Sequence, residues 1–185
     1  MGIPSKPLGV KIFVAVMYKS SLNPDDVLKK LDEKFGRREC IYGPLPFSWS
    51  EYYSTEMGED LQKLYISYEE LFDRAELPAI KLFTNNIESE LAENNKRKVN
   101  IDPGYISRDK VVLATTKDFY HRLYLSDGIY GEVTLHYKRG QYRFFSWTYP
   151  DYRQPGIYQF FERARSTLVK EIRSQEEVSE SKDSN

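Results

Sequence analysis

The stretches VKIFVAVM (10–17) and NPDDVLKKLDEKFG (23–36) decide the fold, because they place a strand and a helix in immediate succession. The first stretch is apolar and β-branched, which is typical of a buried strand. In the second, Asn23 can cap a helix, Pro24 suits its first turn, and the acidic residues that follow favour its positive end. Helical spacing gives this helix one apolar stripe, formed by Val27, Leu28, Leu31 and Phe35.

A second round of strands and a helix follows. Arg37–Trp49 predicts a short extended segment broken by a turn, and Gln62–Phe72 predicts a strand because its apolar residues alternate in part. We expect a helix within Leu77–Ala92 and another strand over Arg97–Ile101. The order up to this point is therefore β-α-β-β-α-β.

Local signals around these elements leave some boundaries open. The second helix begins either near Pro78 or at Asn85, whose side chain would cap it. Asp102-Pro103-Gly104 predicts a turn that ends the preceding strand. Ser107 can then cap a short helix over Arg108–Thr115.

A hairpin is the clearest feature of the remaining chain. The strands Phe119–Leu125 and Ile129–Lys138 are joined by Ser126-Asp127-Gly128, a typical hairpin connection. If Asp127 and Gly128 form a two-residue loop, Arg122 lies opposite Val133 and His121 lies near Thr134. A shift of register would change these pairs.

The complete order of elements predicts an α+β fold with a mainly antiparallel sheet. Its first half matches a ferredoxin-like βαββαβ unit, and a β-meander and a C-terminal helix opened by Pro155 follow. We expect one globular domain over residues 1–173, because no Gly/Ser/Pro-rich linker divides it. Residues 174–185 contain almost no apolar side chain and predict a disordered polar tail.

Composition excludes several classes of protein. Lys and Arg total 27 against 28 Asp and Glu, so no basic field attracts nucleic acid. The longest apolar run, Ile12–Met17, is too short to cross a bilayer, and Met1–Lys11 lacks the features of a signal peptide. The single cysteine, Cys40, fits a reducing compartment. We therefore expect a cytoplasmic protein without a membrane segment or a clear nucleic-acid partner.

No motif assigns a reaction or a cofactor. Neither GxxxxGK[ST] nor GxGxxG occurs, so the two common phosphate-binding loops are missing. A Cys/His zinc array, HExxH and GxSxG are also missing. The chain has carboxylates that suit a divalent cation such as Mg²⁺, so such an ion is one alternative for a cofactor. The sequence does not decide whether the chain is an enzyme.

Polar residues concentrate in residues 99–153, a region that otherwise resembles strands. Gly131 beside Glu132 suggests close approach of a ligand, because glycine weakens a strand interior. We take Asp102, His121 and Glu132 as candidate catalytic residues. Candidate ligand-binding residues are Asn100, Arg122, Asp151 and Arg153. Each also has a structural alternative: a turn for Asp102, a helix cap or ion pair for Asp151 and Arg153, and a buried structural role for His121.

Several motifs resemble one prokaryotic family, domain of unknown function 4416. They are VNIDPGY (99–105), LATTKDF (113–119), SDGIYGEVTL (126–135) and WTYPDYR (147–153), together with PFSWSEYYSTEMG (46–58) and IKLFTN (80–85). The resemblance implies a small single-domain bacterial or archaeal protein, and it supplies no activity or site residues. Some members carry names that suggest GTP binding, but this chain has neither a P-loop nor an N/T-K-x-D element.

Two functions of different class follow from these observations. The first is an enzyme or binding protein for a small anionic ligand, phosphorylated or carboxylated, with a nucleotide as one example. The alternative is a non-catalytic interaction or adaptor domain, suggested by the aromatic loop Phe47–Tyr53. The oligomeric state is not indicated.

Overall fold

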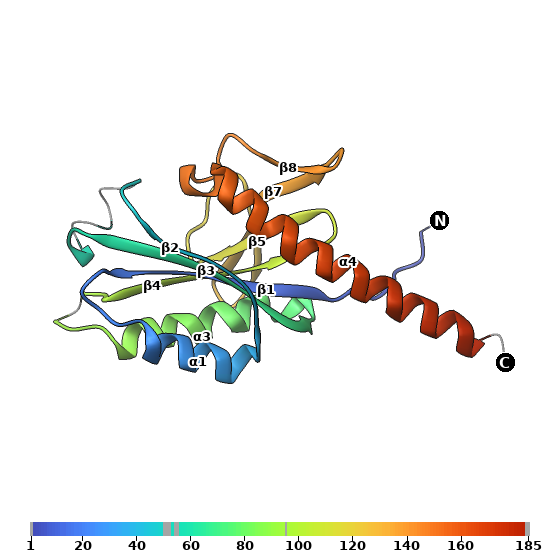
Figure 1. The fold of residues 1–185 in the computed structure, drawn as a ribbon, viewed down its shortest axis with the longest axis horizontal. Helices are drawn as coiled ribbons and strands as arrows, with labels where there is room; N and C mark the ends of the chain where they lie inside the picture. Colours follow the sequence, from blue (N-terminus) through green and yellow to red (C-terminus); the bar gives the residue numbers. More distant parts are fainter. Residues whose placement is uncertain (1, 50–52, 54–55, 95, 184–185) are drawn as a thin grey trace.

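The first half of the chain forms four antiparallel strands and two helices. The computed structural model describes residues 2–49, 53, 56–94 and 96–183. The sheet order β2-β3-β1-β4 is that of a ferredoxin-like, split βαβ unit, so the prediction for this half is confirmed (Figure 1). The elements are β1 (Val10–Lys19), α1 (Asp25–Phe35), β2 (Arg38–Pro46), β3 (Leu61–Phe72), the 3₁₀ turn η1 (Arg74–Glu76), α3 (Leu77–Glu90) and β4 (Val99–Ile106).

The second half extends the same sheet. Strand β5 pairs with β4, β7 pairs with β5, and both β6 and β8 pair with the far edge of β7. The α+β class with a mainly antiparallel sheet and a C-terminal helix is thereby confirmed. The elements are β5 (Lys110–Thr115), β6 (Arg122–Ser126), β7 (Ile129–Lys138), β8 (Gln141–Phe144), the 3₁₀ turn η2 (Pro150–Arg153) and α4 (Pro155–Asp183).

The sheet separates two apolar cores. Helices α1 and α3 cover one face, and α4 crosses the other (Figure 1). Alternation along β1 supplies both cores: Val14 and Val16 pack toward α1 and α3, while Phe13 and Ala15 pack toward α4. None of the helices in the described part of the chain has the length and apolarity needed to cross a membrane.

The turn that Asp102-Pro103-Gly104 predicts is absent, because β4 runs through it to Ile106. A Cβ atom at Gly104 would lie 2.4 Å from the carbonyl oxygen of Val112 and 2.5 Å from the ring of Phe13. This glycine therefore serves close packing rather than a turn. Pro103 has no N–H to donate, and it directly precedes the first residue of β4 that pairs with β5.

Two further segments differ from the sequence-based expectation. The helix expected over 108–115 is wrong, because Lys110–Thr115 is strand β5, with four consecutive buried apolar residues. Helix α4 continues to Asp183, through most of the predicted polar tail. Residues 173–177 of this helix are exposed, so this turn and a half does not pack into the core. The division into a domain and a tail stays a prediction. The start of α3 at Leu77 makes Pro78 an early helical residue.

One buried lysine holds α4 against the sheet. The side chain of Lys11 in β1 is fully buried, and its Nζ donates to Glu39 Oε1 at 2.6 Å and to Glu171 Oε1 at 2.9 Å. It also donates to the backbone oxygen of Glu69 at 3.2 Å. Burial raises the pKa of Glu39, although the charge of Lys11 acts against that shift. The ammonium thus joins β1, β2, β3 and α4.

We expect Lys11→Ala to lower the free energy of unfolding by about 3–5 kcal/mol, because it leaves the carboxylate of Glu39 buried without its cation. Urea denaturation followed by circular dichroism measures this. Lys30→Ala is the control, since Lys30 forms an equally short but exposed pair with Glu90 and its loss should change little. Equal effects of the two substitutions would contradict the role of Lys11.

Candidate functional site

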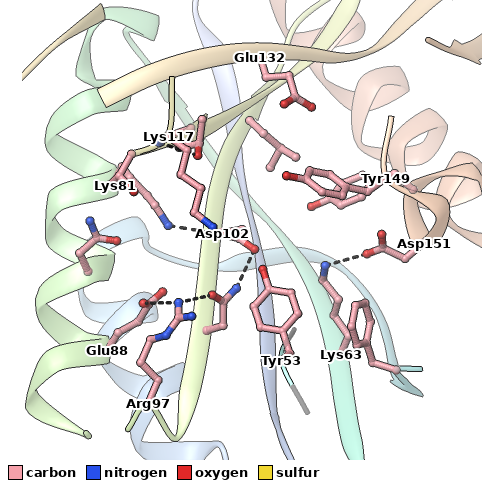
Figure 2. A pocket seen from close by; sticks show the side chains of 18 of the residues that line it. Tyr53, Lys63, Lys81, Glu88, Arg97, Asp102, Lys117, Glu132, Tyr149 and Asp151 are labelled. Atoms are coloured by element: carbon pink, nitrogen blue, oxygen red, sulfur yellow. Dashed lines mark hydrogen bonds and ion pairs between the residues drawn. The ribbon is translucent and has the colours of Figure 1, made fainter. Parts of the chain in front are cut away.

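A cavity opens where the sheet divides between β4 and β5. The ladder between them joins only Gly104–Ile106 to Val111–Leu113, so the start of β4 and the end of β5 diverge. The cavity has a volume of about 920 Å³. Its walls come from both halves of the chain, including α3 on one side and residues 149–152 on the other (Figure 2).

Charged side chains of both signs line this cavity in equal number among the described residues. The cations come from five separate segments, which only the fold brings together. They are Lys63, Lys81, Arg97, Lys117 and Arg122. The carboxylates are Glu56, Glu88, Asp102, Glu132 and Asp151.

Arg97 organises the wall between α3 and the start of β4. It forms a bidentate pair with Glu56, in which Nε donates at 2.8 Å and Nη2 at 2.6 Å. Its Nη1 donates to Asn100 Oδ1 at 2.7 Å and lies 3.5 Å from Glu88 Oε2. The hydrogen bonds from Arg97 lower the pKa of Glu56 despite partial burial. This wall is therefore charged and fixed in place.

Asp102 lies in the middle of the cavity, with Lys81 and Lys117 extending toward it (Figure 2). Asn100 Nδ2 donates to its Oδ2 at 2.7 Å, and Lys81 Nζ lies 3.4 Å from its Oδ1. Burial acts to raise the pKa of Asp102, but the charges of Lys81 and Lys63 and the Asn100 amide outweigh it, and the pKa is lowered. Asp102 is consequently ionised at neutral pH and can accept a proton or a hydrogen bond.

Glu88 is the cavity carboxyl that is shifted in the opposite direction. Its Oε1 accepts a hydrogen bond from the backbone N–H of Ile101 at 2.6 Å, and its side chain is only 9% exposed. Burial raises the pKa of Glu88 by more than Lys81 and Arg97 lower it. Glu88 therefore holds a proton more readily than an ordinary glutamate, whereas Asp102 releases one more readily.

Lys63 occupies an aromatic cage beside Asp151. Its Nζ donates to Asp151 Oδ2 at 2.7 Å, and the hydroxyl of Tyr65 donates to the same oxygen at 2.7 Å. The ammonium lies 5.1 Å from the ring centre of Phe47, 5.4 Å from that of Tyr65 and 5.2 Å from that of Tyr152. All three distances lie within cation–π range, which helps to offset the cost of burying this charge.

Glu132 is held in place from behind the cavity wall. Its Oε2 accepts a hydrogen bond from Arg122 Nε at 3.0 Å and lies 3.0 Å from His121 Nε2. Arg122 Nη2 also donates to the hydroxyl of Tyr149 at 3.1 Å. The imidazole of His121 stacks on Trp147, with ring centres 5.1 Å apart. His121 is not a lining residue, so it acts on the cavity through Glu132.

The structure brings together most of the candidates chosen from the sequence. Arg153 is separate: its Nε donates to Thr148 O at 2.7 Å, its Nη2 donates to Ser146 O at 2.9 Å, and it does not line the cavity. His121 lies behind the wall, as described above. The five that line the cavity are Asn100, Asp102, Arg122, Glu132 and Asp151. Their roles in binding or catalysis stay predictions.

The first half of the chain supplies cavity residues that the sequence did not single out, above all Lys63, Lys81, Glu88 and Arg97. A signal existed for the helix, because Lys81, Asn85 and Glu88 are spaced i, i+4 and i+7 and thus share one face. Lys63 alternates with the apolar residues of β3 and gave no comparable signal.

Within the described residues, no group of three or more His, Cys, Asp or Glu side chains is arranged to hold a metal ion. A divalent cation in this cavity would need further oxygen ligands from water or from a bound molecule, as Mg²⁺ often has.

Comparison with protein families gives one match, which covers residues 8–168. The matching family is described as Domain of unknown function (DUF4416). The chain belongs to the DUF4416 family. The match includes every strand and all of the cavity residues described above. No curated protein matches the chain, and no solved structure does.

We expect stability to fall as the pH is lowered below the ordinary carboxyl pKa of about 4, because Asp102 has a lowered pKa in the folded state. Its contribution is present above the unfolded-state pKa and is lost as the pH falls through the folded-state pKa. Asp102→Asn should therefore reduce the proton uptake on unfolding by up to one proton. Urea denaturation at several pH values between neutral and acidic gives the slope of the unfolding free energy against pH, which reports this proton uptake. An unchanged slope in Asp102→Asn would contradict the lowered pKa of Asp102.

Proposed function

We propose that this DUF4416 protein binds a small anionic ligand, phosphorylated or carboxylated, in the cavity between β4 and β5. The observation that carries the proposal is the convergence of five cationic side chains from separate segments on one cavity. Cavities with a few convergent polar groups are the usual sites for small molecules. Each of Lys81, Arg97 and Arg122 is already oriented by a carboxylate, so binding would cost little further ordering.

The lysines keep hydrogen-bonding capacity for a ligand. An ammonium carries three donors, and Lys63 spends one on Asp151. Lys81 donates to the carbonyl oxygen of Ile101 at 2.9 Å and contacts Asp102 at 3.4 Å. The remaining N–H groups of both residues are suited to phosphate or carboxylate oxygens. Lys117 approaches the same space from the end of β5 (Figure 2).

The same cavity contains what proton transfer would need. Asp102 is kept ionised by its neighbours and can accept a proton or a hydrogen bond, and Glu88, whose pKa is raised, suits an acid. Glu132 would act as a second anion whose position depends on His121 and Arg122. Two carboxyls whose surroundings push their pKa values apart are a common arrangement in enzymes, so catalysis is part of this proposal.

A nucleotide is one ligand that fits the proposal. Trp49 and Tyr149 line the cavity and are about half exposed, at 50% and 47%. Aromatic faces of this kind can stack a base while the cations hold its phosphates. Sugar phosphates and carboxylates would bind through the cationic side chains alone, without stacking on an aromatic ring.

The test is calorimetric titration of the protein with pyrophosphate, citrate and mononucleotides. We expect Lys117→Met to weaken binding at least tenfold without changing stability, because Lys117 is exposed at the cavity rim. Lys30→Met is the matched control, since Lys30 lies on α1 outside the cavity. Absence of binding to all probes, or equal effects of both substitutions, would contradict the proposal.

A second candidate function is self-association, and the exposed apolar surface of β6 favours it. The patch expected at Phe47–Tyr53 falls partly outside the described residues, and its ends line the cavity. Five of the large exposed apolar side chains instead gather around β6, the last strand in the sheet order. They are Phe119, Tyr120, Leu123, Tyr124 and Leu125, which are 42–77% exposed.

The partner we propose for β6 is a second copy of the chain. An unprotected edge strand offers unpaired backbone groups, and β6 carries no charged side chain after Arg122. Two identical strands can pair antiparallel about a two-fold axis. Five half-exposed large side chains would bury on the order of 500 Å² per copy, which approaches the range of weak specific interfaces.

Sedimentation velocity over a range of protein concentrations tests self-association. We expect dimers for the unaltered protein and monomers for Leu123→Lys, because a charge at the centre of β6 opposes edge pairing. Leu82→Lys is the control, since Leu82 is also exposed but lies on α3. A monomeric unaltered protein at high concentration would rule out this function.

The cellular setting belongs to the same proposal. Cys40, the single cysteine, is a buried free thiol, which supports a cytoplasm as a reducing compartment. The prokaryotic origin rests on the motifs that the chain shares with a prokaryotic family.

A further inference from the structure

Tyr152 is a buried tyrosine whose hydroxyl has no hydrogen-bond partner in the part of the chain that the structure describes. The side chain belongs to η2 and is 1% exposed. Its ring stacks with Phe161 at 6.1 Å and meets Tyr65 edge-on at 5.6 Å, so packing fixes its position. None of the described residues forms a hydrogen bond with its hydroxyl.

An unpaired buried hydroxyl is unfavourable, at a cost of about 1–3 kcal/mol. Phenylalanine would fill the same space without that cost, so the oxygen itself requires an explanation. The neighbouring Tyr65 shows the ordinary solution, because its hydroxyl donates to Asp151 at 2.7 Å.

The side chain of Tyr152 forms part of the cavity wall. Tyr152 is a lining residue, and the groups that act electrostatically on its hydroxyl are Asp151, Asp102, Tyr149 and Tyr53. All four line the same cavity. The hydroxyl therefore lies among charged and polar groups of the cavity wall, but it makes no hydrogen bond with any of them.

Lys63 completes the arrangement around this hydroxyl. Its ammonium lies over the Tyr152 ring, 5.2 Å from the ring centre, and Asp151 anchors it at 2.7 Å. The ammonium and the Tyr152 side chain therefore belong to the same part of the cavity wall. Burial and then the charge of Asp151 raise the pKa of Tyr152, so its hydroxyl keeps the proton that it would donate.

We propose that the Tyr152 hydroxyl and the Lys63 ammonium together bind an oxyanion of the ligand, and that Tyr152 distinguishes phosphate or carboxylate oxygens from groups that cannot accept a hydrogen bond. This inference rests on the proposed function. Since the hydroxyl is covered in the present arrangement, contact requires a side chain in front of it to move. Tyr149, a lining residue that is about half exposed and accepts one hydrogen bond from Arg122, is the side chain that we expect to move.

The experiment compares Tyr152→Phe with the unaltered protein in calorimetric titrations with pyrophosphate and, separately, with citrate. We expect the affinity for the oxyanion that the site accepts to fall about tenfold or more, the equivalent of one good hydrogen bond. The melting temperature should stay the same or rise, because the unpaired oxygen is removed. The two probes distinguish a phosphorylated from a carboxylated ligand.

Tyr142→Phe is the matched control. Tyr142 is equally buried, at 3% exposure, and its hydroxyl also has no partner among the described residues, but it does not line this cavity. Its removal should leave the affinity for both probes unchanged. A general effect of losing a buried hydroxyl would change both variants alike, and that result would overturn the inference.

The remaining outcomes separate this inference from the proposed function. If Tyr152→Phe binds like the unaltered protein while Lys117→Met does not, the role of Tyr152 is wrong and the anion site stands. If Tyr152→Phe unfolds or loses stability, the hydroxyl is structural and the inference is overturned. If the unaltered protein binds neither probe, both the inference and the proposed function fail.

Discussion

The rest of the structure depends on the short ladder between β4 and β5. Three residue pairs, from Gly104↔Leu113 to Ile106↔Val111, join the ferredoxin-like half to the second half. Beyond Gly104 the two strands part, and backbone hydrogen bonding gives way to a space lined by side chains. Pro103 marks this point with a residue that cannot donate to a ladder. A continuous sheet would leave no room for the cavity.

The cavity is charged but balanced, and this balance explains how it can exist inside a folded domain. An isolated buried charge is very costly, whereas a paired and hydrogen-bonded one is tolerated. Asp151 neutralises Lys63, Asp102 accompanies Lys81, and Glu132 binds Arg122. The site is therefore organised without a ligand, and an incoming anion would compete with internal carboxylates instead of filling an empty positive field. Such competition favours ligands with several oxygens over single ions.

The sequence predicted the architecture better than it predicted the cavity. The order of strands and helices up to β4, the Asp127-Gly128 hairpin and the apolar face of α1 follow from local patterns, and the structure has all three. The segment from Asp102 to Thr115 was misread, because proline and glycine signal a turn locally, while the packing of Gly104 against Phe13 is a contact between distant residues. Strand pairing of this kind leaves little trace in the neighbouring sequence.

Among the cavity residues, too, local sequence patterns identified some and missed others. Those in 99–153 were found because polar groups interrupt strands there. Lys63 and Lys81 were missed, because each lies in a segment whose apolar pattern already explained it, and only tertiary structure directs both toward Asp102.

The irregular pairing between β6 and β7 limits how this family can vary. Ser126 pairs with Ile129 across a two-residue turn, but an irregularity between Tyr124 and Ser126 shifts the rest of β6 by one residue. Arg122 thereby lies opposite Glu132 instead of Val133. A regular ladder of the same length would place Arg122 opposite Val133 and separate the arginine from its carboxylate. The extra residue in β6 is thus as important to this ion pair as its two side chains, and relatives that keep the pair should either keep the irregularity or lose one residue together with it.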